Sequence, residues 1–386
     1  MDEFYADLWY HLGRALRAQT MEHTKYKMIF ETLRSEICSG KYETRKFLSE
    51  AQLVRRFGVA RFTVVQALEG LRKAGLVVRR KGKGTFLTAF ARTATGPIGL
   101  ILPGLAYGEI FTPICSEVAR MCQGLGRSVL LGNLSVDDPG ARAEMAKKLA
   151  QDFVRQRVAG VIFHPIEYVC DSAGVNKEIL AILEDAQVPV VLIDYDVVSS
   201  PARSRYDVVG IDNVASGRRL AEHVLAQGAK SALFVKRKDC ASTVEQRLLG
   251  VAEAFRAAGR AWGRRNVVVA EPSACGAALK ALKGMPKPCA VVCGYDLHAV
   301  GVLKALERER SLAVPRDVLL AGFDDVQCAR VMSPSLTTIH QPCVQIAQTA
   351  VEVLMRRMRK PESAVLTLLL DAPLVVREST GCRPAV

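Results

Sequence analysis

The feature that most constrains this fold is a long alternation of two kinds of segment. From residue 98 onward, short runs that are apolar throughout are separated by longer segments with apolar residues at helical spacing. Strands that are apolar at every position indicate a parallel sheet covered by helices on both faces. The sequence therefore predicts an α/β region with room for two lobes. The expected strands are 98–104, 128–134, 160–165, 188–194, 207–212, 231–236, 266–270, 289–294 and 318–323, and the expected helices include 109–124, 141–156, 215–226 and 243–258.

Residues that follow the predicted strands are candidates for a binding site, because ligands of open parallel sheets bind beyond the carboxyl ends of the strands. Tyr107 and Phe111 follow the first strand, and His164 lies at the end of the third. Tyr295 and Asp296 follow the eighth. Each position also has an ordinary structural interpretation: Phe111 as a core residue, His164 as a loop residue before a proline, and Asp296 as a helix N-cap. The pattern alone leaves both interpretations open.

The positive charge of the chain is concentrated near its N-terminus. Residues 22–92 contain 16 Lys and Arg against 6 Asp and Glu, a net charge of +10 out of +14 for the whole chain. A compact basic segment on a nearly neutral remainder is typical of a nucleic-acid-binding module. A solvated basic face that favours solubility is the alternative.

The basic segment begins with a pattern of short helices. Ile29, Leu33 and Ile37 fall about one helical turn apart, and Gly40 is expected to end this first helix. A third helix is expected over 60–74, with apolar residues on one side.

A second helix between them has clear signals at both its start and its end. Ser49 and Gln52 form the S-x-x-Q pattern of a capping box, in which each side chain bonds the other residue's backbone amide. Gly58 suits the left-handed position that ends a helix. Asp212, after the fifth predicted strand, is expected to cap the helix that follows it.

Two β-rich runs between 76 and 88 flank the sequence KGKG at 81–84, which indicates a hairpin with a basic tip. Three short helices followed by such a hairpin predict a winged helix-turn-helix. The G-x-x-x-x-G-K-[ST] spacing of a phosphate-binding loop is absent. A small, polar segment ending in Gly-Pro then suggests a linker. The predicted organisation is an N-terminal extension over 1–24, a winged helix-turn-helix over 25–88, a linker over 89–97 and a two-lobed domain over 98–380.

Several classes of protein are disfavoured by the composition. No apolar run is long enough to span a membrane, and the N-terminus lacks the form of a secretory signal, which predicts a cytoplasmic protein. The 11 cysteines show neither CxxC pairs nor zinc-ligand spacing, so we expect free thiols and no metal. No cofactor fingerprint or catalytic motif is present, which argues against an enzyme. The remaining enzymatic alternative is a sugar-acting protein that uses acidic residues at the strand ends.

The basic segment resembles the winged helix-turn-helix of the GntR group of bacterial repressors. The resemblance combines caps, core and wing in order and spacing, rather than one short motif. The positions that carry it are Tyr26, ICSG at 37–40, Ser49, Glu50, Leu53, FGV at 57–59, Arg61, Thr63, Val64, Ala67, Leu68, Leu71, GL at 75–76 and GKGTF at 82–86.

The resemblance implies double-stranded DNA as a partner, with contacts from two helices. Ser49 would start a helix whose N-terminal amides face a phosphate. Arg61 would make a bidentate contact to a guanine, and Gln66 could pair with an adenine. Thr63 would contact a phosphate or a thymine methyl. For each residue taken singly, a solvated surface side chain is the alternative.

The wing would add contacts to the DNA backbone or the minor groove. Lys81 and Lys83 supply charge, Gly82 permits close approach, and Thr85 belongs to the same motif. The sequence departs from the GntR pattern at two helix positions, with Val65 where Arg is usual and Ala60 where a capping Ser or Thr is usual. We therefore expect Arg61 and the wing lysines to carry more of the binding.

The α/β region is similar to the LacI-type effector domain, which has the fold of periplasmic sugar-binding proteins. The matching pieces are VGIDNVASG at 209–217, RLLG at 247–250, CGYDLHAVG at 293–301, VPRDV at 314–318, GFDD at 322–325 and SLTTIHQP at 335–342. Together the two resemblances give the arrangement of arabinose-repressor-type regulators. They imply a homodimeric repressor, with a palindromic operator and a sugar-like effector bound between the lobes.

By this second resemblance, Arg247 and Asp324 would grip ligand hydroxyls or a carboxylate. Tyr107, Phe111 and His164 would line the first lobe, with Tyr295 and Asp296 on the second, as candidates beside their structural interpretations. Tyr295-Asp296 stands where an Asn-Asp pair is common in the LacI type, which leaves room for an aromatic-stacked ligand. No cofactor is implied.

Overall fold

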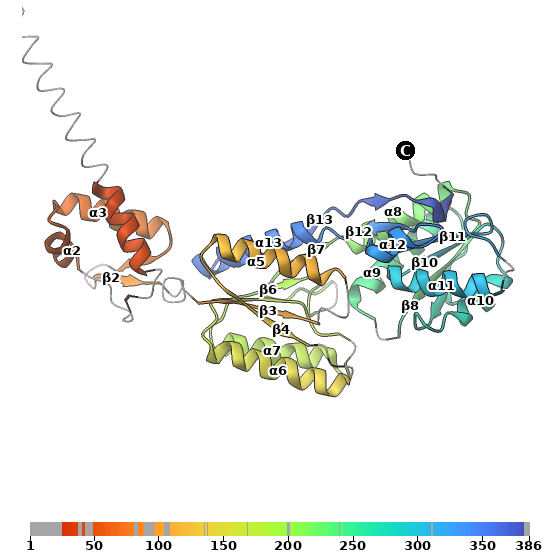
Figure 1. Ribbon diagram of the computed structural model, residues 1–386, viewed down its shortest axis with the longest axis horizontal. Helices are drawn as coiled ribbons and strands as arrows, with labels where there is room; N and C mark the ends of the chain where they lie inside the picture. Colours follow the sequence, from red (N-terminus) through yellow and green to blue (C-terminus); the bar gives the residue numbers. More distant parts are fainter. Residues whose placement is uncertain are drawn as a thin grey trace, which may run out of the picture.

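The computed structural model describes residues 25–37, 41–42, 49–80, 84–88, 96–103, 109–134, 136, 138–167, 169–198, 201–238, 240–309 and 312–381. Within them the chain forms a small N-terminal head followed by two α/β lobes (Figure 1). The predicted fold class is confirmed. Neither the N-terminal extension nor most of the linker falls within the described residues.

The head has the three helices and the hairpin that the sequence predicts. Leu53, Val64, Leu68 and Leu71 are fully buried in its core, on the faces that the helical spacing indicated. In the hairpin, the strands pair antiparallel from Val77 opposite Leu87 to Arg80 opposite Gly84. The elements are a helix at residues 25–37, α2 (Glu50–Phe57), α3 (Arg61–Lys73), β1 (Val77–Arg80) and β2 (Gly84–Leu87).

The first lobe is a six-stranded sheet in the order β13-β7-β6-β5-β3-β4, with all neighbours parallel. Helices α5 and α13 cover one face and α6 and α7 the other (Figure 1). The strands are β3 (Ile98–Leu102), β4 (Val129–Asn133), β5 (Gly160–Phe163), β6 (Val190–Ile193), β7 (Asp207–Ile211) and β13 (Thr367–Leu370); the helices are α5 (Phe111–Gly124), α6 (Pro139–Arg155), α7 (Ser172–Asp185) and α13 (Cys343–Arg359).

The second lobe has a six-stranded sheet in the order β14-β12-β11-β10-β8-β9, in which only the β12–β14 pair is antiparallel. The strands are β8 (Ser231–Lys236), β9 (Val267–Val269), β10 (Cys289–Cys293), β11 (Val318–Asp324), β12 (Thr337–His340) and β14 (Leu374–Val375). The helices are α8 (Asn213–Ala226), α9 (Ser242–Ala257), α10 (Gly276–Lys283), α11 (Asp296–Glu309) and α12 (Gln327–Val331), with 3-10 turns at Arg264–Asn266 and Glu378–Thr380.

The chain passes between the lobes three times, after β7, after β12 and after β13. All nine predicted strands are present, from β3 to β11. The last three strands are absent from the predicted list, because their sequences are short or mixed in polarity, as in the TTIH run of β12. The lobes are therefore built from interleaved rather than consecutive parts of the chain.

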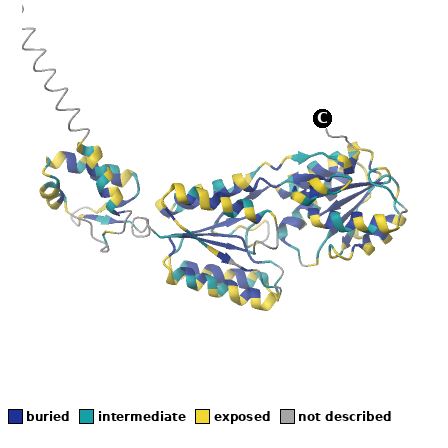
Figure 2. Ribbon diagram, in the orientation of Figure 1, coloured by how far each residue is buried: buried dark blue, intermediate teal, exposed yellow. Residues whose placement is uncertain are grey.

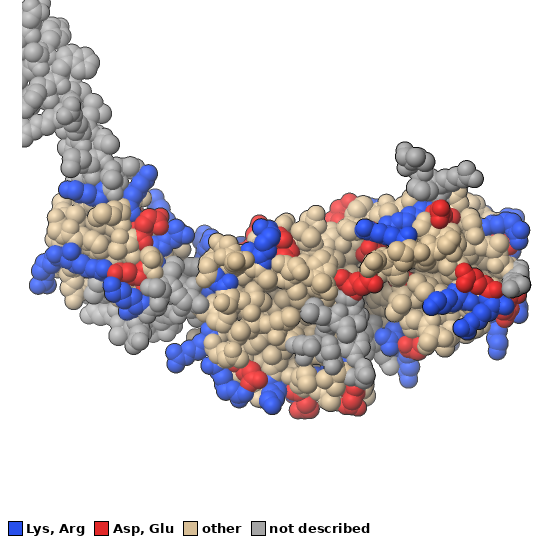
Figure 3. Space-filling model, viewed as in Figure 1, with Lys and Arg blue, Asp and Glu red and all other residues tan. Residues whose placement is uncertain are grey.

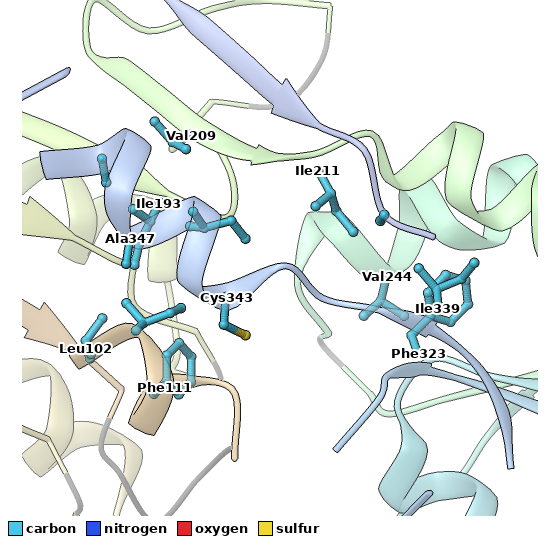
Figure 4. Packing of buried hydrophobic residues seen from close by; sticks show 14 of the residues in the cluster. Leu102, Phe111, Ile193, Val209, Ile211, Val244, Phe323, Ile339, Cys343 and Ala347 are labelled. Carbon is cyan, nitrogen blue, oxygen red and sulfur yellow. The ribbon is translucent and has the colours of Figure 1, made fainter. Parts of the chain in front are cut away.

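The core follows the sheets, whose strands are mostly buried along their length (Figure 2). One apolar cluster runs from the first lobe into the second, from Leu102 and Ile193 through Ile211 to Val244 and Phe323 (Figure 4). Full burial of each large apolar side chain contributes about 1.5–3 kcal/mol, so this cluster ties the lobes together at the crossovers.

The nine cysteines among the described residues are free thiols, as predicted. The nine expected strands and the four expected helices of the α/β region begin and end within two residues of their predicted limits, and Asp212 caps α8 by accepting from the Ala215 amide at 2.8 Å. No helix within the described ranges is both long and apolar enough to cross a membrane.

Candidate functional site

The exposed face of the head is built by α2 and α3. The capping box at the start of α2 is formed: the Gln52 amide donates to Ser49 Oγ at 3.3 Å, and the Ser49 amide donates to Gln52 Oε1 at 2.8 Å. Gly58 ends the helix in the left-handed region, with φ of 62°. Ala60 gives α3 no side-chain cap. These local predictions are confirmed.

Arg61 is exposed at the start of α3, with 79% of its side chain accessible. Its Nε donates to Glu50 Oε2 at 2.9 Å, and Arg79 of the hairpin pairs with the other oxygen of the same carboxylate. Glu50 therefore links the start of α2, the start of α3 and the wing. Lys and Arg side chains gather around this part of the head (Figure 3).

The other predicted DNA contacts have different surroundings. Gln66 is exposed on α3, and Ser49 is exposed at the start of α2. Thr63 is only 2% exposed and packs into the head, so the expected contact of its side chain with DNA does not fit this structure. Thr85 is also buried, within β2. The wing residues Lys81, Gly82 and Lys83 lie outside the described residues.

A cavity of about 480 Å³ lies between the carboxyl ends of the two parallel sheets. This volume is within the range of small-molecule sites. Six of the seven predicted ligand residues of the two lobes line it. Its lining is Pro103, Glu109, Ile110, Phe111, Pro139, Arg142, His164, Ile166, Glu167, Asp194, Arg237, Thr243, Arg247, Pro272, Tyr295, Asp296, Leu297, His298, Asp324, Val326 and Cys328.

Arg247 of α9 forms the centre of the second-lobe wall. Its Nη2 lies 3.3 Å from Asp324 Oδ1, its Nε donates to Asn213 Oδ1 at 2.9 Å, and its Nη1 donates to the Gly294 carbonyl at 2.8 Å. The guanidinium also lies over the Phe323 ring, 4.7 Å from its centroid. Arg247 is therefore held rigidly, with one edge toward the carboxylate that lines the cavity.

The two acidic residues of this wall differ in their partners. Asp296 accepts from Thr338 Oγ1 at 2.7 Å and from the Val326 amide at 3.1 Å, so it joins α11 to β12 and to the loop after β11. Burial raises the pKa of Asp296 well above its usual range, and the nearby Asp324 adds to this. Burial likewise raises the pKa of Asp324, and Arg247 only partly offsets the effect.

The first-lobe wall is formed by His164 and its neighbours. Phe111 and Tyr195 contact its ring edge-on, at centroid distances of 5.0 and 5.5 Å. Nε2 lies 3.5 Å from Asp194 Oδ2 and 3.8 Å from Glu167 Oε1. Burial disfavours a charged imidazole here, but the two carboxylates outweigh it and raise the pKa of His164.

Two family models match this chain. "Bacterial regulatory proteins, gntR family" matches residues 25–87, and "Periplasmic binding protein-like domain" matches residues 221–380. The chain joins a GntR-type helix-turn-helix domain to a periplasmic-binding-protein-like domain. This is the organisation of a ligand-responsive transcriptional regulator, and the recognition made from the sequence is confirmed.

The chain is also similar to known transcriptional regulators. The HTH-type transcriptional repressor PurR of Glaesserella parasuis is 28% identical over 297 residues, which cover 74% of this chain and 81% of that protein. A LacI family transcriptional regulator from Mycobacterium smegmatis is 28% identical, with a TM-score of 0.61 over 73% of this chain and 98% of the other. The transcriptional regulator CelR in complex with cellobiose is 22% identical, with a TM-score of 0.62 over 83% of this chain and 91% of the other. These proteins are regulators rather than enzymes.

Several residues of the two lobes that line or support the cavity were not among the predicted contacts. Asp194 directly follows β6, so the strand-end rule that selected His164 could have found it. Glu167 and Arg142 carried no such signal. His298 donates from Nε2 to the Ala270 carbonyl at 3.1 Å, while its buried Nδ1 has no partner among the described residues. Tyr107 lies outside the described residues.

Proposed function

We propose that this protein is a DNA-binding transcriptional repressor whose affinity for its operator is controlled by a small polyhydroxylated ligand in the cavity between the lobes. The observation that carries the proposal is the joining, in one chain, of an exposed Arg61 face on the head with a cavity between the lobes that is lined by charged and aromatic side chains. The head is proposed to span residues 25–88 and the ligand-binding domain residues 98–380.

The lining of the cavity supports a sugar-like ligand. Asp324 and Arg247 face it from the second lobe and His164 from the first, which supplies both hydrogen-bond donors and acceptors. Phe111 and Tyr295 add aromatic surface. Sites for small polar ligands combine a few fixed polar groups with apolar and aromatic walls. We therefore assign these five residues to ligand binding, with Asp296 as their support.

The three passages of the chain between the lobes would allow a ligand to control DNA binding. A ligand that contacts both walls favours the closed arrangement of the lobes by its difference in affinity for the two states. In a homodimer, that closure would change the spacing of two heads on a palindromic operator. Because such a regulator acts on chromosomal DNA, we propose a cytoplasmic location for the protein.

The test is an electrophoretic mobility shift of the full chain on its own upstream DNA, with and without a panel of sugars. We expect specific binding at moderate salt, and release by at least one sugar. Asp324→Asn should bind the DNA but lose the response to the sugar. Asp371→Asn, at an exposed carboxylate paired with Arg219, is the control and should respond normally. Failure of the unmodified chain to bind DNA would refute the proposal, whatever the sugars do.

A further inference from the structure

Three side chains that can ligate a metal meet on the first-lobe wall of the cavity. His164 follows β5, Glu167 lies three residues further along the same loop, and Asp194 follows β6. One ligating atom of each lies within 4.8 Å of the others, and all three residues line the cavity. The two loops that carry them follow β5 and β6, which pair in parallel as neighbouring strands of the first-lobe sheet.

The separations within this cluster fit ligands around an ion better than hydrogen bonds between the side chains. The distances from Nε2 of His164, 3.5 Å to Asp194 and 3.8 Å to Glu167, exceed the usual hydrogen-bond range of roughly 2.7–3.2 Å. Two ligands of a tetrahedral zinc ion lie about 3.4 Å apart. Three atoms at these separations surround a point roughly 2.4 Å or less from each, so a small inward movement gives ordinary metal–ligand bonds.

The orientation of the imidazole is also that of a metal ligand. Nδ1 of His164 lies 2.9 Å from the Pro165 carbonyl, and a carbonyl accepts only from a protonated nitrogen. In the neutral ring the lone pair is therefore on Nε2, which faces both carboxylates. A backbone carbonyl that fixes the tautomer in this way is the usual support of a metal-bound histidine.

The outer contacts of Asp194 leave its second oxygen to the cluster. Gln341 Nε2 lies 3.4 Å from Asp194 Oδ1, whereas Oδ2 faces His164. Gln341 is nearly fully buried, and its Oε1 has no partner among the described residues. The guanidinium of Arg247 is already paired with Asp324 at 3.3 Å, which limits its repulsion of an ion at the cluster.

We propose that His164, Glu167 and Asp194 form a binding site for a divalent first-row transition-metal ion such as Zn²⁺, with its remaining coordination positions open to the cavity. One imidazole and two carboxylates suit such an ion, whereas Mg²⁺ and Ca²⁺ prefer oxygen ligands throughout. Binding releases any proton from Nε2. Hydroxyl or carboxylate oxygens of a bound ligand would complete the coordination, and this last step rests on the proposed function.

Metal binding is measured on the full chain after treatment with a chelator, by calorimetric titration with Zn²⁺, Co²⁺ and Mg²⁺ in the absence of DNA and sugar. We expect one saturable Zn²⁺ or Co²⁺ site per chain and no matching Mg²⁺ site. Glu167→Gln keeps the size of the side chain and should weaken binding by about tenfold or more. Glu109→Gln changes another carboxylate of the same cavity, outside the cluster, and should leave metal binding unchanged.

Three results would overturn the site. One is the absence of saturable binding, which would assign the cluster to a protonated imidazole between carboxylates. Another is equal weakening in Glu167→Gln and Glu109→Gln. The third is Co²⁺ binding with the charge-transfer absorption of thiolate ligands, which would assign the ion to cysteines elsewhere. Since no DNA is present, failure here leaves the regulatory proposal intact, and failure to bind DNA leaves the metal site intact.

Discussion

The change that tests the DNA-binding face most directly is Arg61→Ala. The guanidinium donates through Nε to Glu50, which leaves both terminal nitrogens available to a base, and most of the side chain is exposed. Val64 and Leu68 hold α3 against the core from its other side. Alanine therefore removes the contact without disturbing the packing of the head.

The expected loss follows from what this guanidinium would contact. A bidentate contact to guanine discriminates by about 1–3 kcal/mol, which corresponds to roughly 5- to 150-fold in affinity for the operator. Loss of the exposed pair with Glu50 costs the fold about 1 kcal/mol or less. Binding to unrelated DNA depends on total charge, and should fall much less.

The assay compares the dissociation constants for operator and unrelated DNA at several salt concentrations. Arg72→Ala is the matched control, because it removes the same charge near the other end of α3, where Arg72 pairs with Glu69. Only Arg61→Ala should reduce the ratio of specific to non-specific affinity. Equal ratios in the two variants would refute the assignment of Arg61 as a base-reading residue.

Glu50→Gln tests the same face from the opposite direction. The variant keeps the size of the side chain but loses the charge that links Arg61 and Arg79. Binding to unrelated DNA should become tighter and more salt-dependent, because one negative charge is removed, while the preference for the operator falls as Arg61 loses its fixed position. An unchanged preference would show that Glu50 does not position the arginine.

Three further predictions concern stability. Gly250→Ala would place a Cβ 2.0 Å from a carbonyl of α8, so it should destabilise the second lobe by about 1–3 kcal/mol in denaturant unfolding, whereas Gly124→Ala, with open space around it, should not. Arg357→Ala removes the bidentate partner, at 2.8 and 3.0 Å, of the Asp207 carboxylate, which is 1% exposed. The free energy of unfolding in denaturant should fall by about 3–5 kcal/mol. A fall of less than about 1 kcal/mol would contradict this prediction. The hydrogen bond from Arg56 lowers the pKa of Glu36 from 4.5 to about 2. The stability that this pair gives the head is therefore present above pH 4.5 and is lost as the pH falls toward 2. Glu36→Gln should flatten the pH dependence of head unfolding in that interval.

The features that the sequence predicted best depend on neighbouring residues. The capping box needs only Ser49 and Gln52, and the helix end needs only the freedom of Gly58 to adopt a positive φ. The apolar strands were found for a similar reason, since burial on both faces leaves a continuous apolar run. Each of these signals is complete within a few residues, so no knowledge of the rest of the fold was required.

Features that join distant parts of the chain were harder to predict. Strand β13 pairs with β7, some 160 residues earlier, and nothing in TLLL specifies that partner. Arg247 and Asp324 were selected by resemblance, but the contact of Arg247 with Asn213 emerges only in the folded chain. The cluster around His164 likewise needs two loops brought together by neighbouring strands. Because ligands bind beyond the carboxyl ends of strands, the sequence could have indicated Asp194, which directly follows β6. It could not have indicated Glu167, which lies further along its loop.

The start of α3 departs from the local preferences of a helix N-terminus at the position where we propose a contact with DNA. Ala60 offers no cap, and Arg61 puts a cation at the helix N-terminus, where the dipole disfavours positive charge. The residue preferences of a helix N-terminus disfavour both Ala60 and Arg61 at these positions. In the folded head the Glu50 carboxylate, from the first turn of α2, lies against Arg61 and supplies the negative charge that this end of α3 lacks. The unfavourable residue is therefore retained by a partner from another helix, in a position where its guanidinium faces solvent. Such a conflict between local preference and fold is expected at functional side chains. It points to Arg61, the same arginine that the basic charge of the segment and the resemblance to the GntR group indicate.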